Sequence, residues 1–136
     1  MTSITKLMCG IILLTVPTIQ YGGFFLLKIL SGQEGVALTN FQKSMFRAGH
    51  AHAGVLVILS LIAQVLTDQT NLNPTLEWIV RIGFPLAAIL VSGGFFASAI
   101  GNSLSAPNRL IWILYCGIAS LGIAVIILGV GLITNR

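Results

Sequence analysis

One stretch near the C-terminus, residues 110–135, reads LIWILYCGIASLGIAVIILGVGLITN and contains no Asp, Glu, Lys or Arg. Residues 8–27, 48–67 and 82–108 share this property over about 20 residues or more. Because an α-helix rises about 1.5 Å per residue, each stretch is long enough to cross a hydrocarbon core of about 30 Å. The sequence therefore predicts an all-α integral membrane protein, a four-helix bundle forming a single transmembrane domain over residues 1–136.

The composition agrees with a multi-pass membrane protein. Of the 136 residues, 56% are apolar and 7% are charged, and the mean hydropathy of +0.99 lies far outside the usual balance of a soluble domain. The net charge of +4 comes from few residues, mostly near the predicted helix ends, so it does not indicate a nucleic-acid partner. The expected surroundings are the lipid bilayer, and the expected location is the bacterial inner (cytoplasmic) membrane.

Local signals set the ends of the predicted helices. Gly32 can take the left-handed conformation that ends the first helix, and Asn40 is a candidate N-cap for the second. Asn73 and Pro74 give the third helix the clearest start in the chain. Four spans place both termini on one side of the membrane together with the loop at Asp68. The predicted helices cover residues 4–30, 40–66, 74–101 and 106–133.

Glu77 and Arg81 form one candidate ion pair near the start of the third predicted helix. They are four residues apart, so their side chains share a face of the helix and can pair. We interpret the pair as a solvated or interfacial salt bridge.

Two histidines, His50 and His52, lie inside a membrane-length apolar run, in the segment FRAGHAHAG at 46–54. Ionisable groups within a membrane are costly unless they have a partner, so each one indicates a functional site by default. Helix counting places both histidines roughly 15 to 18 Å from the start of the second helix. The same count brings polar and small residues of the other three helices to this depth, namely Gln20, Tyr21, Ser92, Gly93, Gly94, Trp112, Tyr115 and Cys116.

The two histidines are expected to have different environments. Residues two apart on a helix point about 200° from each other, so both cannot easily bind one ion. Arg47, His50 and Gly54 follow i, i+3, i+7 spacing and share a face, which offers a partner for an anionic group, a metal ligand and open space in a row. The small residues around them fit either close helix packing or a flat cavity for a planar ligand.

Haem is the cofactor that a pair of membrane histidines indicates best. A single imidazole can hold haem iron and leave the opposite position open for a substrate. Zinc is disfavoured, because the chain has only two histidines and no carboxylate or cysteine shares the layer with suitable spacing. A Ser-His-Asp arrangement is excluded as well, because no acid lies at that depth.

The segment RAGHAHAG at 47–54, opening a second helix in a four-helix chain of this length, resembles the histidine motif of the styrene oxide isomerase and hydroxylaminobenzene mutase group of small membrane isomerases. GFF at 94–96 and SAPNR at 105–109 are similar to an aromatic run and a turn of the isomerases. The resemblance implies a homo-oligomer, a trimer, with haem b between subunits. It also implies that one histidine of the second helix binds ferric iron, which acts as a Lewis acid on an epoxide oxygen.

The specific matches are confined to these short pieces. The His-x-Gly pattern of the family selects His52, whereas the face shared with Arg47 and Gly54 selects His50, so both remain candidate iron ligands. An asparagine that the family carries six residues after its histidine is replaced here by Ile58 or Leu56. The aspartate and tyrosine that the family carries on its third helix are also missing. The candidate groups for orienting a substrate are Tyr21, Asn102 and Tyr115.

Three functions follow from these observations. The first is a haem b-dependent isomerase that rearranges a small hydrophobic epoxide, or an N-oxygenated aromatic, without net redox change. The second is a non-catalytic membrane haem protein for electron transfer or sensing. The third is a structural subunit of a larger membrane complex, in which the histidines serve as interfacial hydrogen-bonding groups. Oligomerisation is also expected from the stripe of small residues Gly117, Ser120 and Ala124, which suits close helix contact within or between subunits.

Overall fold

The computed structural model describes residues 1–33, 35 and 37–135, and its regular structure there is entirely helical. Each of the four helices is long and apolar enough to cross a membrane. The prediction of an all-α membrane four-helix bundle is therefore confirmed. The helices are α1 (Ser3–Leu30), α2 (Asn40–Thr67), α3 (Pro74–Ser98) and α4 (Ile111–Thr134).

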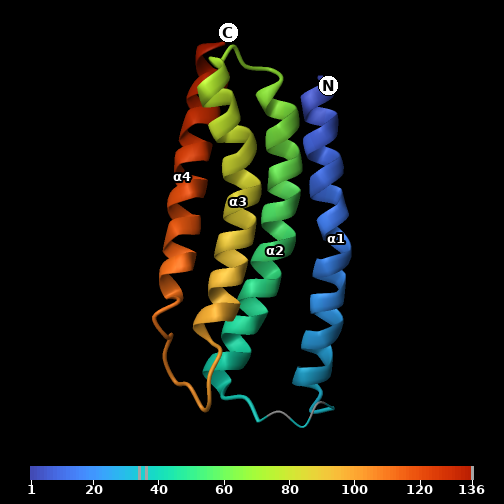
Figure 1. The fold of residues 1–136 in the computed structure, drawn as a ribbon, viewed down its shortest axis with the longest axis vertical. Coiled ribbons are helices and arrows are strands. Elements are labelled where there is room, and N and C mark those ends of the chain that lie inside the picture. Colours follow the sequence, from blue (N-terminus) through green and yellow to red (C-terminus); the bar gives the residue numbers. More distant parts are fainter. Residues whose placement is uncertain (34, 36, 136) are drawn as a thin grey trace.

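The helices follow one another across the bundle in chain order (Figure 1). The most extensive packing joins α3 to α4 and α2 to α3, whereas α1 packs mainly on α2. Both chain ends and the α2–α3 loop lie at one end of the bundle, as predicted, and the other two loops lie at the opposite end (Figure 1). We call these the terminal end and the loop end.

The N-cap of α3 is the residue that the sequence predicts, whereas the N-cap of α2 is a different one. Asn73 caps α3 as predicted, accepting a hydrogen bond of 3.0 Å from the Leu76 N–H. The N-cap of α2 is Thr39 and not Asn40, which is the first helical residue. Thr39 accepts from the Gln42 N–H while the Gln42 side chain accepts from the Thr39 N–H, a capping box that satisfies two helix-end donors at once.

The turn between α3 and α4 is longer than predicted, because α3 ends at Ser98 and α4 begins only at Ile111. The side chain of Asn108 accounts for both shifts. Its Nδ2 donates to the carbonyls of Ala97 and Ile100 at 3.0 Å each, and its Oδ1 accepts from the Leu110 N–H at 2.8 Å. The residues after Pro107 therefore close a turn onto the end of α3 instead of starting a helix.

Replacing Asn108 with alanine is expected to destabilise the protein by about 1–2 kcal/mol, because the Ala97 and Ile100 carbonyls and the Leu110 N–H each lose one hydrogen bond. The measurement is the free energy of unfolding in detergent micelles titrated with sodium dodecyl sulfate. Asn102→Ala is the matched control, since Asn102 is exposed in the same turn. Equal losses for both variants would contradict this account of the turn.

The small-residue stripe of α4 is used within the chain. Ser120 donates to the Gly83 carbonyl of α3 at 3.0 Å, and Ala124 is fully buried. A Cβ added to Gly117 would lie 2.7 Å from the Val91 N, so the backbones of α3 and α4 are in close approach there. The stripe thus holds α4 against α3 and leaves no separate support for an intersubunit contact.

A buried cluster of charged and polar groups joins three helices at the terminal end. Arg81 pairs with Glu77 at 2.8 Å, which confirms the predicted pairing. However, Arg81 is only 1% exposed whereas the Glu77 side chain is 34% exposed, so the solvated alternative is wrong for the Arg81 side of the pair. Its guanidinium also contacts Asp68 at 2.8 Å and Thr5 at 2.9 Å. We call Arg81, Glu77, Asp68, Thr5 and Gln64 the Arg81 cluster.

The Arg81 cluster keeps Asp68 ionised. Burial by itself would raise the pKa of the Asp68 carboxyl, but hydrogen bonds from Thr5, Arg81 and Thr2 outweigh it and hold that pKa well below its usual range. Because Thr5 belongs to α1, Asp68 follows α2 and Arg81 belongs to α3, the cluster fastens the terminal ends of these helices together.

Candidate functional site

The two histidines face different neighbours, as their spacing predicts. His50 is half-buried and its ring lies against α1, whereas His52 is exposed and its ring lies against Phe95 of α3. Both leave α2 at the depth of Gly22 and Gly23 of α1, so the predicted layer exists. The two imidazoles do not converge on one point.

The His50 ring packs on the glycines of α1. A Cβ added to Gly23 would lie 3.0 Å from both Cε1 and Nε2 of His50, and one added to Gly22 would lie 3.9 Å from its Nδ1. The glycines of α1 therefore leave room for the His50 ring, which packs closely against them. Among the described residues, no hydrogen-bond partner of this ring is found.

The His52 ring is held by two contacts. Its Nδ1 lies 2.8 Å from the Ala48 carbonyl oxygen of the preceding turn, and its ring centroid lies 4.9 Å from that of Phe95. A carbonyl oxygen can only accept, so Nδ1 carries a proton, and in the neutral imidazole Nε2 then has the lone pair. The His52 side chain as a whole is exposed on the surface of the single chain. Such an imidazole is prepared to act as a ligand.

Arg47 and Gly54 lie on either side of the histidines along α2. Arg47 is exposed, toward the loop end, and lies five residues from His52, or about 7.5 Å along the helix axis. Gly54 is half-buried, and a Cβ added there would meet no atom within 4 Å. The open space that the sequence predicts on this face is therefore present at Gly54.

The three candidate substrate-orienting residues lie apart from one another. Tyr21 is 71% exposed on α1, and Tyr115 is 50% exposed on α4, where it makes an edge contact with Trp112 at 5.4 Å. Asn102 is exposed in the turn after α3. Because α1 and α4 are at opposite sides of the bundle (Figure 1), one chain does not bring the two tyrosines to the same site.

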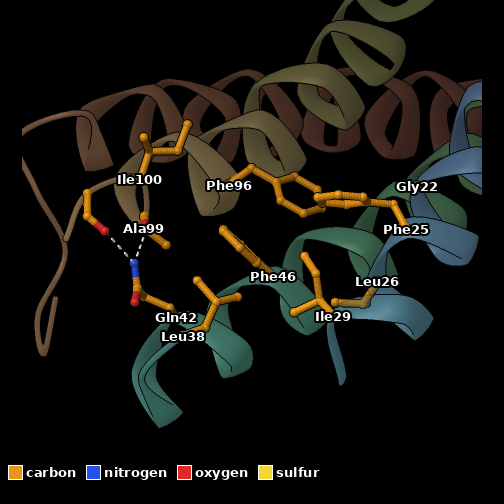
Figure 2. Close-up of a pocket in the computed structure, with 11 residues that line it drawn as sticks. Gly22, Phe25, Leu26, Ile29, Leu38, Gln42, Phe46, Phe96, Ala99 and Ile100 are labelled. Carbon is orange, nitrogen blue, oxygen red and sulfur yellow. Dashed lines mark hydrogen bonds between the residues drawn. The ribbon is translucent and has the colours of Figure 1, made fainter. Parts of the chain in front are cut away.

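Two pockets lie along α2 where it faces α1 and α3. The first, which we call the loop-side pocket, has a volume of about 440 Å³ and includes Phe25, Phe46 and Phe96 in its lining. Figure 2 shows Gln42 at one end of this pocket, donating to the Ala99 carbonyl at 3.0 Å and the Gly101 carbonyl at 2.8 Å. The amide oxygen of Gln42 accepts from the Thr39 N–H in the capping box, so both the nitrogen and the oxygen of this amide are engaged within the protein. Gln42 is therefore a structural residue, and the other residues that line the pocket are apolar.

The second pocket, which we call the central pocket, has a volume of about 250 Å³ and lies nearer the middle of the membrane. It is lined by residues of α1 between 11 and 19, of α2 between 53 and 60 and of α3 between 85 and 92. His50 stands between the two pockets. Along α2, Phe46 lines the first and Ala53 the second, while His50 is one turn from each and shares their face.

The ligand chemistry of the site suits haem better than a bare metal ion. Among the described residues, no three His, Cys, Asp or Glu side chains come together, so an ion held only by side chains of one chain has no ligand set there. Haem requires only an axial imidazole from the protein. His52 meets that requirement because a backbone carbonyl holds its Nδ1 and leaves Nε2 as the ligating nitrogen, whereas no such hydrogen bond holds the His50 ring among the described residues.

Comparisons of the chain with family models, with curated proteins and with solved structures find no match. They therefore neither support nor contradict the resemblance of residues 47–54 to the isomerase group. The geometry of His52 and its surroundings carries the functional argument.

Proposed function

We propose that this protein is a haem b-dependent isomerase of the bacterial inner membrane, with His52 as the axial ligand. Its substrate would be a small hydrophobic epoxide or an N-oxygenated aromatic, rearranged without net redox change. The outward position of His52 favours a haem held between copies of the chain, and the resemblance of the histidine motif implies a trimer.

The observation that carries the proposal is the hydrogen bond between His52 Nδ1 and the Ala48 carbonyl. Histidines that ligate metals usually donate their other ring N–H to a carbonyl or carboxylate, which fixes the tautomer and makes the ligating nitrogen more basic. The contact with Phe95 restricts rotation of the same ring. His50 shows neither feature.

When bound, haem would supply ferric iron as a Lewis acid that polarises the substrate oxygen. The chain would contribute the axial imidazole of His52, whereas Arg47 shares the face of His50 and lies about 140° around α2 from His52. The surrounding helix faces are apolar, so they exclude water that would otherwise hydrolyse a reactive intermediate.

The test is the visible absorption spectrum of the protein purified in detergent after expression with ample haem. The wild-type protein is expected to show a Soret band, and His52→Ala is expected to lose it, because the iron loses its axial nitrogen. His50→Ala is the matched control, two residues away with the same change in side chain, and it should retain the band.

Other outcomes would contradict the binding of haem, the choice of His52 as its ligand, or the isomerase reaction. A colourless wild-type protein would refute haem binding altogether. Loss of the band in His50→Ala with retention in His52→Ala would transfer the ligand role to His50. Haem binding with no aldehyde formed from a panel of aryl epoxides, and no product from hydroxylaminoarenes, would refute the isomerase reaction alone.

A second candidate function is a non-catalytic membrane haem protein for electron transfer or sensing. The separation of Tyr21, Asn102 and Tyr115 favours it, because these three candidate substrate-orienting residues do not come together beside His52 in the described part of one chain. Reversible reduction of the bound haem, together with absence of turnover on the same panel, would identify this function.

A further inference from the structure

The central pocket contains one hydroxyl group that the protein leaves without a partner. Ser92 is 7% exposed, and its Oγ is the buried side-chain polar atom that lacks a hydrogen bond among the described residues. The other hydroxyls of the lining donate to carbonyls of their own helices: Thr15 to Ile12, Thr18 to Thr15 and Ser60 to Leu56, each at 2.6 Å. The pocket therefore presents one unused donor on an apolar wall.

An unpaired buried hydroxyl costs free energy, and a polar group in that situation needs an explanation. The lining offers one unused donor, at Ser92, while the hydroxyls of Thr15, Thr18 and Ser60 can still accept through their lone pairs. The volume of about 250 Å³ is larger than one water requires. The exposed residues Ile11 and Ile89 line it, so it opens sideways between α1 and α3 toward the lipid.

We propose that the central pocket binds a small neutral molecule from the bilayer that is apolar except for one oxygen atom, and that this oxygen accepts a hydrogen bond from the Ser92 hydroxyl. The apolar walls bury the body of the molecule, and Ser92 selects for the oxygen. The site does not depend on haem at His52 and can be tested on colourless protein.

Benzophenone is a suitable probe, because it is apolar, carries one carbonyl oxygen and reacts with nearby C–H groups when irradiated. The protein in lipid nanodiscs is irradiated with increasing probe, and mass spectrometry maps the label. Labelling is expected on α1 between residues 11 and 19 and on α3 between 85 and 92. Ser92→Ala is expected to weaken the apparent affinity about 3- to 10-fold, the ratio that one net hydrogen bond gives.

Two controls separate the hydrogen bond from the shape of the pocket. Ser60→Ala removes another serine of the lining whose hydrogen is already donated to Leu56, so it should leave the affinity unchanged. Diphenylmethane, which has the two rings without the oxygen, should compete equally well in wild-type protein and in Ser92→Ala. Ser92→Thr keeps a hydroxyl and should retain the wild-type preference for benzophenone.

The proposal is overturned if Ser92→Ala and the wild-type protein bind benzophenone equally, or if the label maps to other segments. If the variant does not fold, the wild-type protein decides alone. There, benzophenone should bind about 3- to 10-fold more tightly than diphenylmethane, and equal affinities would mean that the pocket accepts any apolar chain, including a lipid tail.

Discussion

Arg81→Ala is expected to destabilise the protein by about 3–5 kcal/mol, the loss typical of breaking a buried ion pair by removing one partner. The substitution leaves the Asp68 carboxylate buried, with a side chain only 6% exposed, and without its guanidinium. It also removes donors to Thr5 and to Gln64 at 2.9 and 3.2 Å. Unfolding of purified protein in mixed micelles, titrated with sodium dodecyl sulfate, measures the loss.

Two variants test whether loss of the guanidinium from the Asp68 carboxylate is the cause, since Thr2, Thr5 and the N-terminal amino group still contact it. Glu77→Gln alters the more exposed partner of the same guanidinium, whose side chain is 34% exposed, so it should cost no more than about 1 kcal/mol. Combining Arg81→Met with Asp68→Asn removes both buried charges and should recover much of the stability, because a buried pair replaced by neutral groups is often tolerated. A loss below 1 kcal/mol in Arg81→Ala would show that the cluster does not hold the helices together.

The sequence predicts the fold well because the membrane limits the possible structures. Four uncharged stretches of sufficient length leave a four-helix bundle as the simplest arrangement, and their alternating directions place both termini at one end. Asn73 and Gly32 mark local helix ends, which depend on neighbouring residues alone, and both are found as predicted. Depth along each helix is also a local count, so the layer shared by His50 and Gly23 could be predicted.

Features that depend on distant residues could not be predicted in the same way. The burial of Arg81 requires Asp68 and Thr5, which are 13 and 76 residues away in the chain. The end of α3 depends on the Asn108 side chain ten residues further on. Sequence spacing gives the angle between His50 and His52, but it does not show that the His50 ring packs on Gly23 while the His52 ring packs on Phe95.

The sequence indicates the position of the Ser92 hydroxyl in the membrane but not that it lacks a hydrogen-bond partner. Ser92 is a polar residue near the middle of α3, and helix counting predicts that it lies at the depth of the histidines. Its hydrogen-bonding state depends on what α1 and α2 present across the pocket, and those helices contribute hydroxyls that are already engaged. Only the packed structure shows that Ser92 alone among them has no partner.

Gly94→Ala is expected to destabilise the protein by about 2–3 kcal/mol, near the upper part of the range for overpacked sites. A Cβ at this position would lie 2.6 Å from both Cα and Cβ of Leu114 and would also contact the Leu114 N. Most of these atoms belong to the backbone of α4, so no side-chain rotation can relieve the overlap. The same detergent titration measures the loss of stability.

Gly93→Ala is the matched control, because it makes the same change one residue earlier on the same helix. Gly93 is exposed, and a Cβ there would meet nothing within 4 Å. Alanine is the better helix former, so this variant should be neutral or more stable by up to about 1 kcal/mol. If α3 and α4 could separate without cost, both alanines would improve helix propensity and both variants would be stabilised. A large difference between them therefore isolates the close approach of the two backbones as the source of the stability of the α3–α4 pair.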